Sequence, residues 1–217
     1  MATTTKREYK AAVRADRSGS GPTIDDTPVA RFPGATAKFG LFGEVLMVGL
    51  LVAIAGILVV TLPAALAAGI RHLRRFIDAE ASPARTYWHD VRAALPGGLV
   101  VGAVGVIAVA ILALDIDLAN SGFLPGGGAI AILGWVGLGA VAVALLAAAG
   151  AWTPETGWRT AVRSVPAIVM GDVVGALYLA ATAVFVCVAA WALVPLVIPA
   201  LGCAALAVVA IPARRRR

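Results

Sequence analysis

The sequence predicts an all-α fold, a polytopic integral membrane helix bundle of about five transmembrane helices with two short cytoplasmic amphipathic helices. Hydrophobic residues make up 60% of the 217 residues, charged residues make up 14%, and the mean hydropathy is +0.92. A soluble chain is about half apolar and about a quarter charged. The apolar residues fall into long runs, as helices of about 20 residues require in order to cross a hydrocarbon core. A transmembrane barrel would instead show short segments of alternating hydrophobicity.

Composition divides the chain into three regions. Residues 1–38 are predicted to be a disordered basic tail, residues 39–213 the transmembrane helical domain, and residues 214–217 a basic C-terminal tail. The first tail holds seven Lys or Arg and four Asp or Glu but few large apolar side chains, so burial cannot offset the entropy that ordering would cost. Its basic residues are either solvated or form a patch for lipid headgroups.

Five apolar runs are the predicted spans, and the basic residues between them predict the orientation. The runs are 41–68, 97–114, 128–151, 172–193 and 196–211. Arginines follow the first run, the third run and the last run, whereas the segment "DIDLANSGFLPGG" after the second run has no basic residue. Because basic segments beside spans stay in the cytoplasm, these three segments are predicted to be cytoplasmic and the N-terminus to lie outside. The expected location is the cell membrane.

The stretch "TLPAALAAGIRHLRRF" joins the end of the first run to a basic segment without a loop signal. At 100° per residue one edge of this helix is apolar and the other is basic; the apolar edge is Leu66, Ile70, Leu73 and Ile77, and the basic edge is Arg71, Arg74 and Arg75. We expect one helix that kinks near Thr61, because Pro63 removes a backbone donor. Its arginines are expected to reach water and anionic headgroups.

Two further segments have matching patterns and predict the two amphipathic helices. They are "SPARTYWHDVRAALP" and "TPETGWRTAVRSVP", and each starts with a capping residue followed by proline, which is typical of a helix N-terminus. Trp88 and Trp158 are expected at headgroup level, with Arg92, Arg159 and Arg163 facing water. The match indicates either two parallel helix units or a coincidence, since Trp and Arg are common in interfacial helices.

These residues resemble the YesL-like family of bacterial membrane proteins, a domain family of unknown function. The matching stretch is "VVTLPA" at 59–64, followed by "RHLRRF" and by the aromatic helix "TYWHDVRAA". The family usually has a glycine before the proline and another proline ahead of the valines, where this chain has Leu62 and Leu58. The resemblance implies a polytopic bacterial plasma-membrane protein with an accessory role beside carbohydrate-uptake or polysaccharide-degradation systems.

Two carboxylates lie inside the predicted spans, where a buried charge is expensive and often functional. Glu44 lies near the end of its span and is expected to reach water. Asp172 either caps the fourth span or is an intramembrane proton or cation site. The prolines of "VPLVIP" indicate either a turn before a kinked helix or a broken helix that lines a transporter site. The segments "GLVVG" and "GDVVG" favour close helix packing.

The expected function is that of a non-enzymatic accessory or scaffold protein, for example of a carbohydrate-uptake system. His72 and His89 lack partners at metal-ligand spacing, and the sequence predicts no cofactor, no metal, no enzyme activity and no nucleic-acid partner. The alternative is a small-solute transporter or channel. Membrane lipids, chiefly anionic headgroups on the cytoplasmic face, and a transport-system protein are the expected partners. Their candidate contacts are Arg71, Arg74, Arg75, Trp88, Arg92, Trp158, Arg159 and Arg163.

Overall fold

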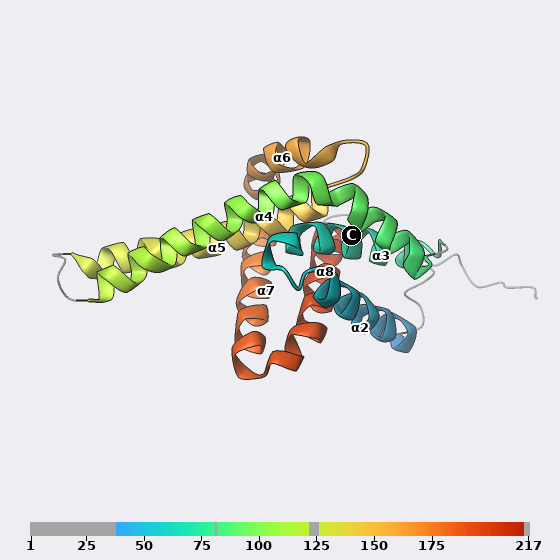
Figure 1. The fold of residues 1–217 in the computed structure, drawn as a ribbon, viewed down its shortest axis with the longest axis horizontal. Helices are drawn as coiled ribbons and strands as arrows, with labels where there is room; N and C mark the ends of the chain where they lie inside the picture. The colour runs from blue at the N-terminus through green and yellow to red at the C-terminus, as the bar shows by residue number, and fades with distance from the viewer. Residues whose placement is uncertain (1–37, 81, 122–125, 215–217) are drawn as a thin grey trace, which may run out of the picture.

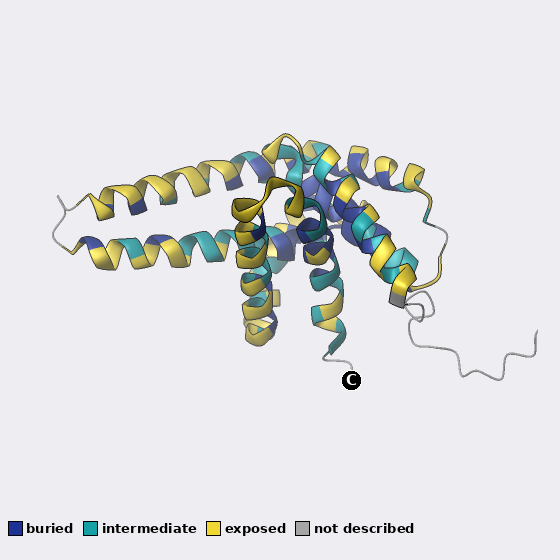
Figure 2. Cartoon of the chain, turned by 90° about the horizontal axis from the view of Figure 1, so that it is seen from below, coloured by how far each residue is buried: buried dark blue, intermediate teal, exposed yellow. Residues whose placement is uncertain are grey.

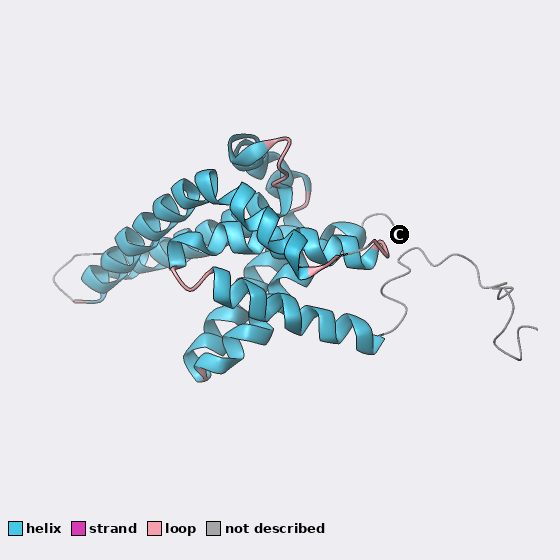
Figure 3. Ribbon diagram, turned by 45° about the vertical axis from the view of Figure 1, so that its right-hand side comes forward, coloured by secondary structure: helices cyan, strands magenta, loops and turns pink. Residues whose placement is uncertain are grey.

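Residues 38–80, 82–121 and 126–214 are described by the computed structural model, and every regular element within these ranges is a helix (Figure 3). The predicted all-α class is therefore confirmed. The predicted tails lie outside the described residues, except for Lys38 and Arg214.

Seven α-helices and two short 3₁₀ turns make up the described chain. They are α2 (Lys38–Ala55), η2 (Val59–Thr61), α3 (Leu62–Ile77), α4 (Ala84–Asn120), α5 (Gly127–Ala151), α6 (Gly157–Gly171), α7 (Val173–Ala192), η3 (Val194–Leu196) and α8 (Val197–Ala213). Four segments are long and apolar enough to cross a membrane, and they correspond to α4, α5, α7 and α8 with its preceding turn. A shorter apolar helix, Phe39–Ala55, is the fifth. These helices identify a membrane protein.

Two helical hairpins extend from a common body. The α4–α5 hairpin reaches far beyond the other helices, and the α7–α8 hairpin runs crosswise to it (Figure 1). Both hairpins expose apolar side chains along most of their length, whereas the buried residues gather where the helices converge (Figure 2). Outward apolar side chains on long helices are expected where lipid is the solvent.

The prediction of one helix from the first span into the basic segment is wrong. Helix α2 ends at Ala55, and α3 begins at Leu62 after the η2 turn. Pro63 lies in the first turn of α3, where its missing N–H costs little. The Thr61 hydroxyl donates to the carbonyl of Ala55 at 2.6 Å and to that of Leu58 at 2.7 Å. Proline and threonine therefore separate two helices rather than kinking one.

The two segments that were predicted to be short amphipathic helices fold differently from each other. The first does not end at Pro96, because it forms the opening turns of the 37-residue helix α4. The second is a separate helix, α6, which begins three residues after Pro154, at Gly157. Gly157 has a φ of +68°, a conformation that glycine adopts without steric cost. The two segments are therefore not equivalent repeated units.

Helix α3 is the centre of the core. It packs against α2, α4, α5 and α8, and the predicted apolar edge is buried along its whole length; these residues are Leu66, Ile70, Leu73 and Ile77. The predicted close packing at Gly98 and Gly102 is confirmed, because a Cβ at Gly98 would lie 2.8 Å from Ala64 and one at Gly102 would overlap the Val60 carbonyl. Small residues thus let α4 approach the start of α3.

The prolines of "VPLVIP" form a turn between two hairpin helices. Pro195 lies within the η3 turn, and Pro199 lies in the first turn of α8. Both positions tolerate the missing N–H donor. The turn alternative is confirmed, and α8 runs without interruption to Ala213.

Candidate functional site

The polar edge of α3 turns toward neighbouring helices rather than toward water. His72 is fully buried, and its Nε2 lies 2.5 Å from Oε1 of Glu44 on α2. The Tyr87 ring approaches His72 edge-on, with 6.4 Å between ring centroids. Glu44 does not reach water freely, since its side chain is 16% exposed. A carboxylate that was expected at the interface is therefore part of the core.

A second pair of contacts joins α3 to α4 through Asp90, whose side chain is 4% exposed. Arg75 donates to Oδ2 of Asp90, and Nη1 of Arg71 lies 3.5 Å from Oδ1. The Arg71 guanidinium also lies over the buried Trp152 ring, 5.8 Å from its centroid. One buried carboxylate is thus the shared ion-pair partner of two arginines, and the three groups together carry a net positive charge.

Arg74 has a different environment from its two neighbours. Its Nη2 donates to the Gly150 carbonyl on α5 at 2.8 Å, but no carboxylate of the described residues lies within ion-pair distance of it. Burial is the main cause that lowers the pKa of the Arg74 guanidinium, and the charge of Arg71 lowers it further, while Asp78 opposes both. An arginine nevertheless stays protonated at neutral pH.

Asp172 occupies the break between α6 and α7. Its Oδ1 accepts from the Gly175 N–H at 2.8 Å and from Nη2 of Arg214 at 2.5 Å. The predicted N-cap is therefore confirmed, and the carboxylate also has a cationic partner from the end of α8. The Arg214 guanidinium lies over the Tyr178 ring, 5.0 Å from its centroid. These contacts join the start of α7 to the end of α8 at the open end of the hairpin.

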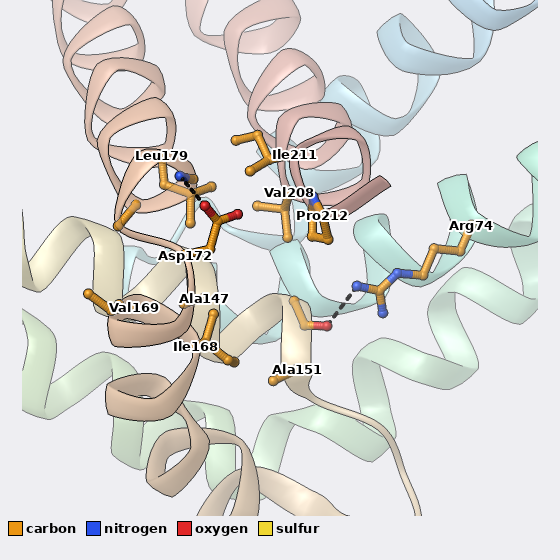
Figure 4. A pocket seen from close by; sticks show the side chains of 13 residues that line it. Arg74, Ala147, Ala151, Ile168, Val169, Asp172, Leu179, Val208, Ile211 and Pro212 are labelled. Atoms are coloured by element: carbon orange, nitrogen blue, oxygen red, sulfur yellow. Dashed lines mark hydrogen bonds between the residues drawn. The ribbon is translucent and has the colours of Figure 1, made fainter. Parts of the chain in front are cut away.

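A cavity of about 240 Å³ lies between Arg74 and Asp172 (Figure 4). Helices α3, α5, α6, α7 and α8 contribute its walls. Apart from these two charged residues its lining is apolar or glycine; the other members are Ala147, Gly150, Ala151, Ile168, Val169, Gly175, Ala176, Leu179, Val208, Ile211 and Pro212. The cavity can accept a small apolar body and places one cation and one carboxylate at its edges.

The remaining predicted contact residues divide between core and surface. Trp158 is buried, and its Nε1 donates to the Ala94 carbonyl at 2.8 Å, so this side chain contacts the protein core rather than lipid or a partner. Trp88 is 38% exposed. Arg92, Arg159 and Arg163 are exposed, and no ion pair joins any of these three to another described residue. Trp158 also contacts Gly97 closely, so α6 lies against α4 beside these arginines.

The structure therefore brings Arg71 and Arg75 together on Asp90, whereas Arg92, Arg159 and Arg163 are exposed. Arg71, Arg74 and Arg75 were expected to reach water, but they are only partly exposed, and each guanidinium lies near a carboxylate or carbonyl oxygen of a neighbouring helix.

Sequence reasoning missed the partners His72, Asp90, Trp152 and Arg214. The signal for Asp90 was present, because it follows Tyr87 by three residues and precedes Ala94 by four on the inward face of a helix. His72 likewise follows the buried Ala68 by four residues.

Comparison of the chain with protein-family models, with curated proteins and with solved structures found no match. The resemblance to the YesL-like family thus stays a prediction that rests on the residues quoted above.

Proposed function

We propose that this chain is a non-enzymatic accessory or scaffold protein of a bacterial plasma membrane, which binds a component of a transport system through one basic face. We define the basic face by Trp88, His89, Arg92, Arg159 and Arg163, all exposed on the first turns of α4 and on α6. The resemblance to the YesL-like family supports a carbohydrate-uptake system as the context.

The observation that carries the proposal is the division of the arginines into two groups. Arg71, Arg75 and Arg214 have carboxylate partners inside the molecule, whereas no ion pair to a described residue holds the arginines of the basic face. Exposed arginines beside a half-exposed tryptophan are the residue types that dominate protein interfaces. The basic face is therefore available to an acidic partner surface.

The orientation supports a cytoplasmic position for the basic face. Residues 97–158 contain no Lys or Arg, so the far end of the α4–α5 hairpin has no basic residue, while its near end lies beside α3 and α6 (Figure 1). Under the positive-inside rule the near end faces the cytoplasm. Reporter fusions at Asn120 and after Arg217 test this orientation, with Asn120 expected outside and Arg217 inside.

A photocrosslinking amino acid at Trp88 in native membranes tests the docking directly. We expect a discrete protein adduct at Trp88, none at Ile132, which is 65% exposed on the apolar α5 surface, and loss of the adduct in the double variant Arg92→Glu with Arg163→Glu. The double variant Arg92→Lys with Arg163→Lys keeps both charges and should keep the adduct.

Two results would contradict the docking proposal. One is an undiminished protein adduct in the glutamate variant. The other is an adduct at Trp88 that contains only lipid, which would make the arginines headgroup anchors, each worth around 1 kcal/mol at an anionic surface.

A small-solute transporter is the second candidate, and the cavity beside Asp172 favours it. Discontinuous helices line the substrate sites of many transporters, and the helical chain is interrupted at Asp172 between α6 and α7. Asp172→Asn should abolish solute flux into proteoliposomes if Asp172 takes part in transport. An accessory protein should keep its partner binding, because asparagine is as good an N-cap as aspartate and only the ion pair with Arg214 is lost.

A further inference from the structure

The cavity between α3, α5, α6, α7 and α8 has an unbalanced charge. Its carboxylate, Asp172, is compensated by Arg214 at 2.5 Å. Its cation, Arg74, contacts a neutral carbonyl, and among the described residues no carboxylate pairs with it. Charges that are largely removed from water are usually paired, so the partly buried, uncompensated guanidinium of Arg74 at an apolar cavity indicates a place for an anion.

Among the three arginines of α3, only Arg74 lacks a carboxylate partner in the described part of the chain. Arg71 and Arg75 lie within the same turn of helix as Arg74, and both have Asp90 as a partner. Arg74 instead donates to the Gly150 carbonyl on α5, and Figure 4 shows its guanidinium directed inward, toward the α5 segment that carries Ala151. Only one of its five N–H donors has a partner in this contact. The remaining donors are available to a ligand.

We propose that this cavity binds a small monocarboxylate with an apolar body, whose carboxylate lies on Arg74. A planar guanidinium matches a carboxylate in a two-bond geometry. A single negative charge balances Arg74, whereas a dianionic phosphate would leave one charge uncompensated among apolar walls. The apolar side chains of α7 and α8, such as Leu179 and Val208, contact the body of the ligand.

Titration of the full chain in nanodiscs of zwitterionic lipid with octanoate tests the proposal, with octanol as the neutral probe of equal chain length. Saturation-transfer NMR measures both affinities. We expect octanoate to bind at least about tenfold more tightly than octanol, because one charge-assisted contact provides a difference of this size. The variant Arg74→Gln should lose this preference. Arg85→Gln, the same substitution at an exposed arginine outside the basic face, should leave the preference intact.

A second variant tests the cavity independently of the charge. Ala176 is a lining residue, and Ala176→Leu fills the space while keeping Arg74, so it should weaken octanoate binding about tenfold or more. This variant also decides the question if Arg74→Gln fails to fold in a size-exclusion and circular-dichroism check.

Any one of three results would overturn the proposal. They are equal affinity for octanol and octanoate, wild-type octanoate binding in Arg74→Gln, and wild-type octanoate binding in Ala176→Leu. Nanodiscs that contain phosphatidylglycerol test whether the natural ligand of the cavity is a carboxylate or the phosphate of a lipid headgroup. Octanoate binding should persist in them, and its complete displacement would assign the cavity to the lipid headgroup instead.

Discussion

Helices α3 and α6 have similar sequences in one respect, since each has arginines on one edge and apolar residues on the other, but the two helices have opposite environments. Helix α3 has eleven buried residues, whereas α6 has only Trp158 and Ala161 buried. The arginines of α3 contact Asp90, Trp152 and the Gly150 carbonyl. Those of α6 are exposed. An amphipathic pattern therefore predicts a helix with two faces but does not say what covers the polar face.

The difference arises from the number of neighbouring helices. Helix α3 is surrounded by α2, α4, α5 and α8, whereas α6 packs mainly on α5 and α4 at the edge of the body (Figure 1). A guanidinium that loses water must gain acceptors, and α3 has them because Asp90 and Gly150 lie on the helices that surround it. The same side chain on α6 stays hydrated.

The largest effect in this comparison is expected from Asp90→Ala. The change leaves the buried guanidinium groups of Arg71 and Arg75 without their carboxylate, which typically costs about 3–5 kcal/mol. Denaturant titration of the protein in detergent micelles measures the free energy of unfolding. Asp117→Ala is the control, because Asp117 is exposed on the same helix. Equal stability of the two variants would mean that the α3 arginines do not depend on Asp90.

An intermediate effect is expected from Trp158→Phe, which sharpens the contrast within α6 itself. The smaller phenyl group lacks the N–H that donates to the Ala94 carbonyl and fills less of the buried site. A buried carbonyl without its donor costs about 1–3 kcal/mol, and the lost packing adds to this cost. Trp88→Phe is the matched control, since Trp88 is 38% exposed and should change stability little. Thermal unfolding of both variants, followed by circular dichroism, measures which substitution lowers the stability more. A more destabilising change at Trp88 would reverse the assignment of core and surface tryptophan.

The smallest effect is expected from neutralising the exposed arginines. The double variant Arg92→Gln with Arg163→Gln should change the free energy of unfolding by less than about 0.5 kcal/mol, as is usual for surface positions. The same titration measures it alongside Asp90→Ala. A loss comparable to that of Asp90→Ala would show that the basic face is part of the folded core, and it would remove the basis of the docking proposal.

The sequence predicted several local features that depend on a single helix. The apolar edge of α3, the cap at Asp172 and the packing glycines Gly98 and Gly102 were all found as expected. Helical periodicity places residues three or four apart on one face, and capping involves neighbours in the chain. These features therefore follow from residues that are close in sequence.

The predictions that were wrong concern prolines that are compatible with two different local structures. The proline of "TLPA" can kink a helix or open a new one, and here it opens α3 after a turn stabilised by Thr61. Pro96 is equally ambiguous, and α4 continues through it. The packing of these segments against α3 and α6 decides which outcome is lower in free energy, and such packing is not visible in the local pattern.

The sequence by itself determined the all-α class, the presence of several long apolar helices and the chemical groups near their ends, because hydrophobicity, helix length and capping are properties of contiguous residues. Only the tertiary structure decided which charges are paired. Glu44 meets His72 across 28 residues, and Asp172 meets Arg214 across 42. Whether a given arginine anchors lipid, holds the core together or faces a cavity depends on which helix lies beside it, and that is settled by the packing of apolar faces elsewhere in the bundle.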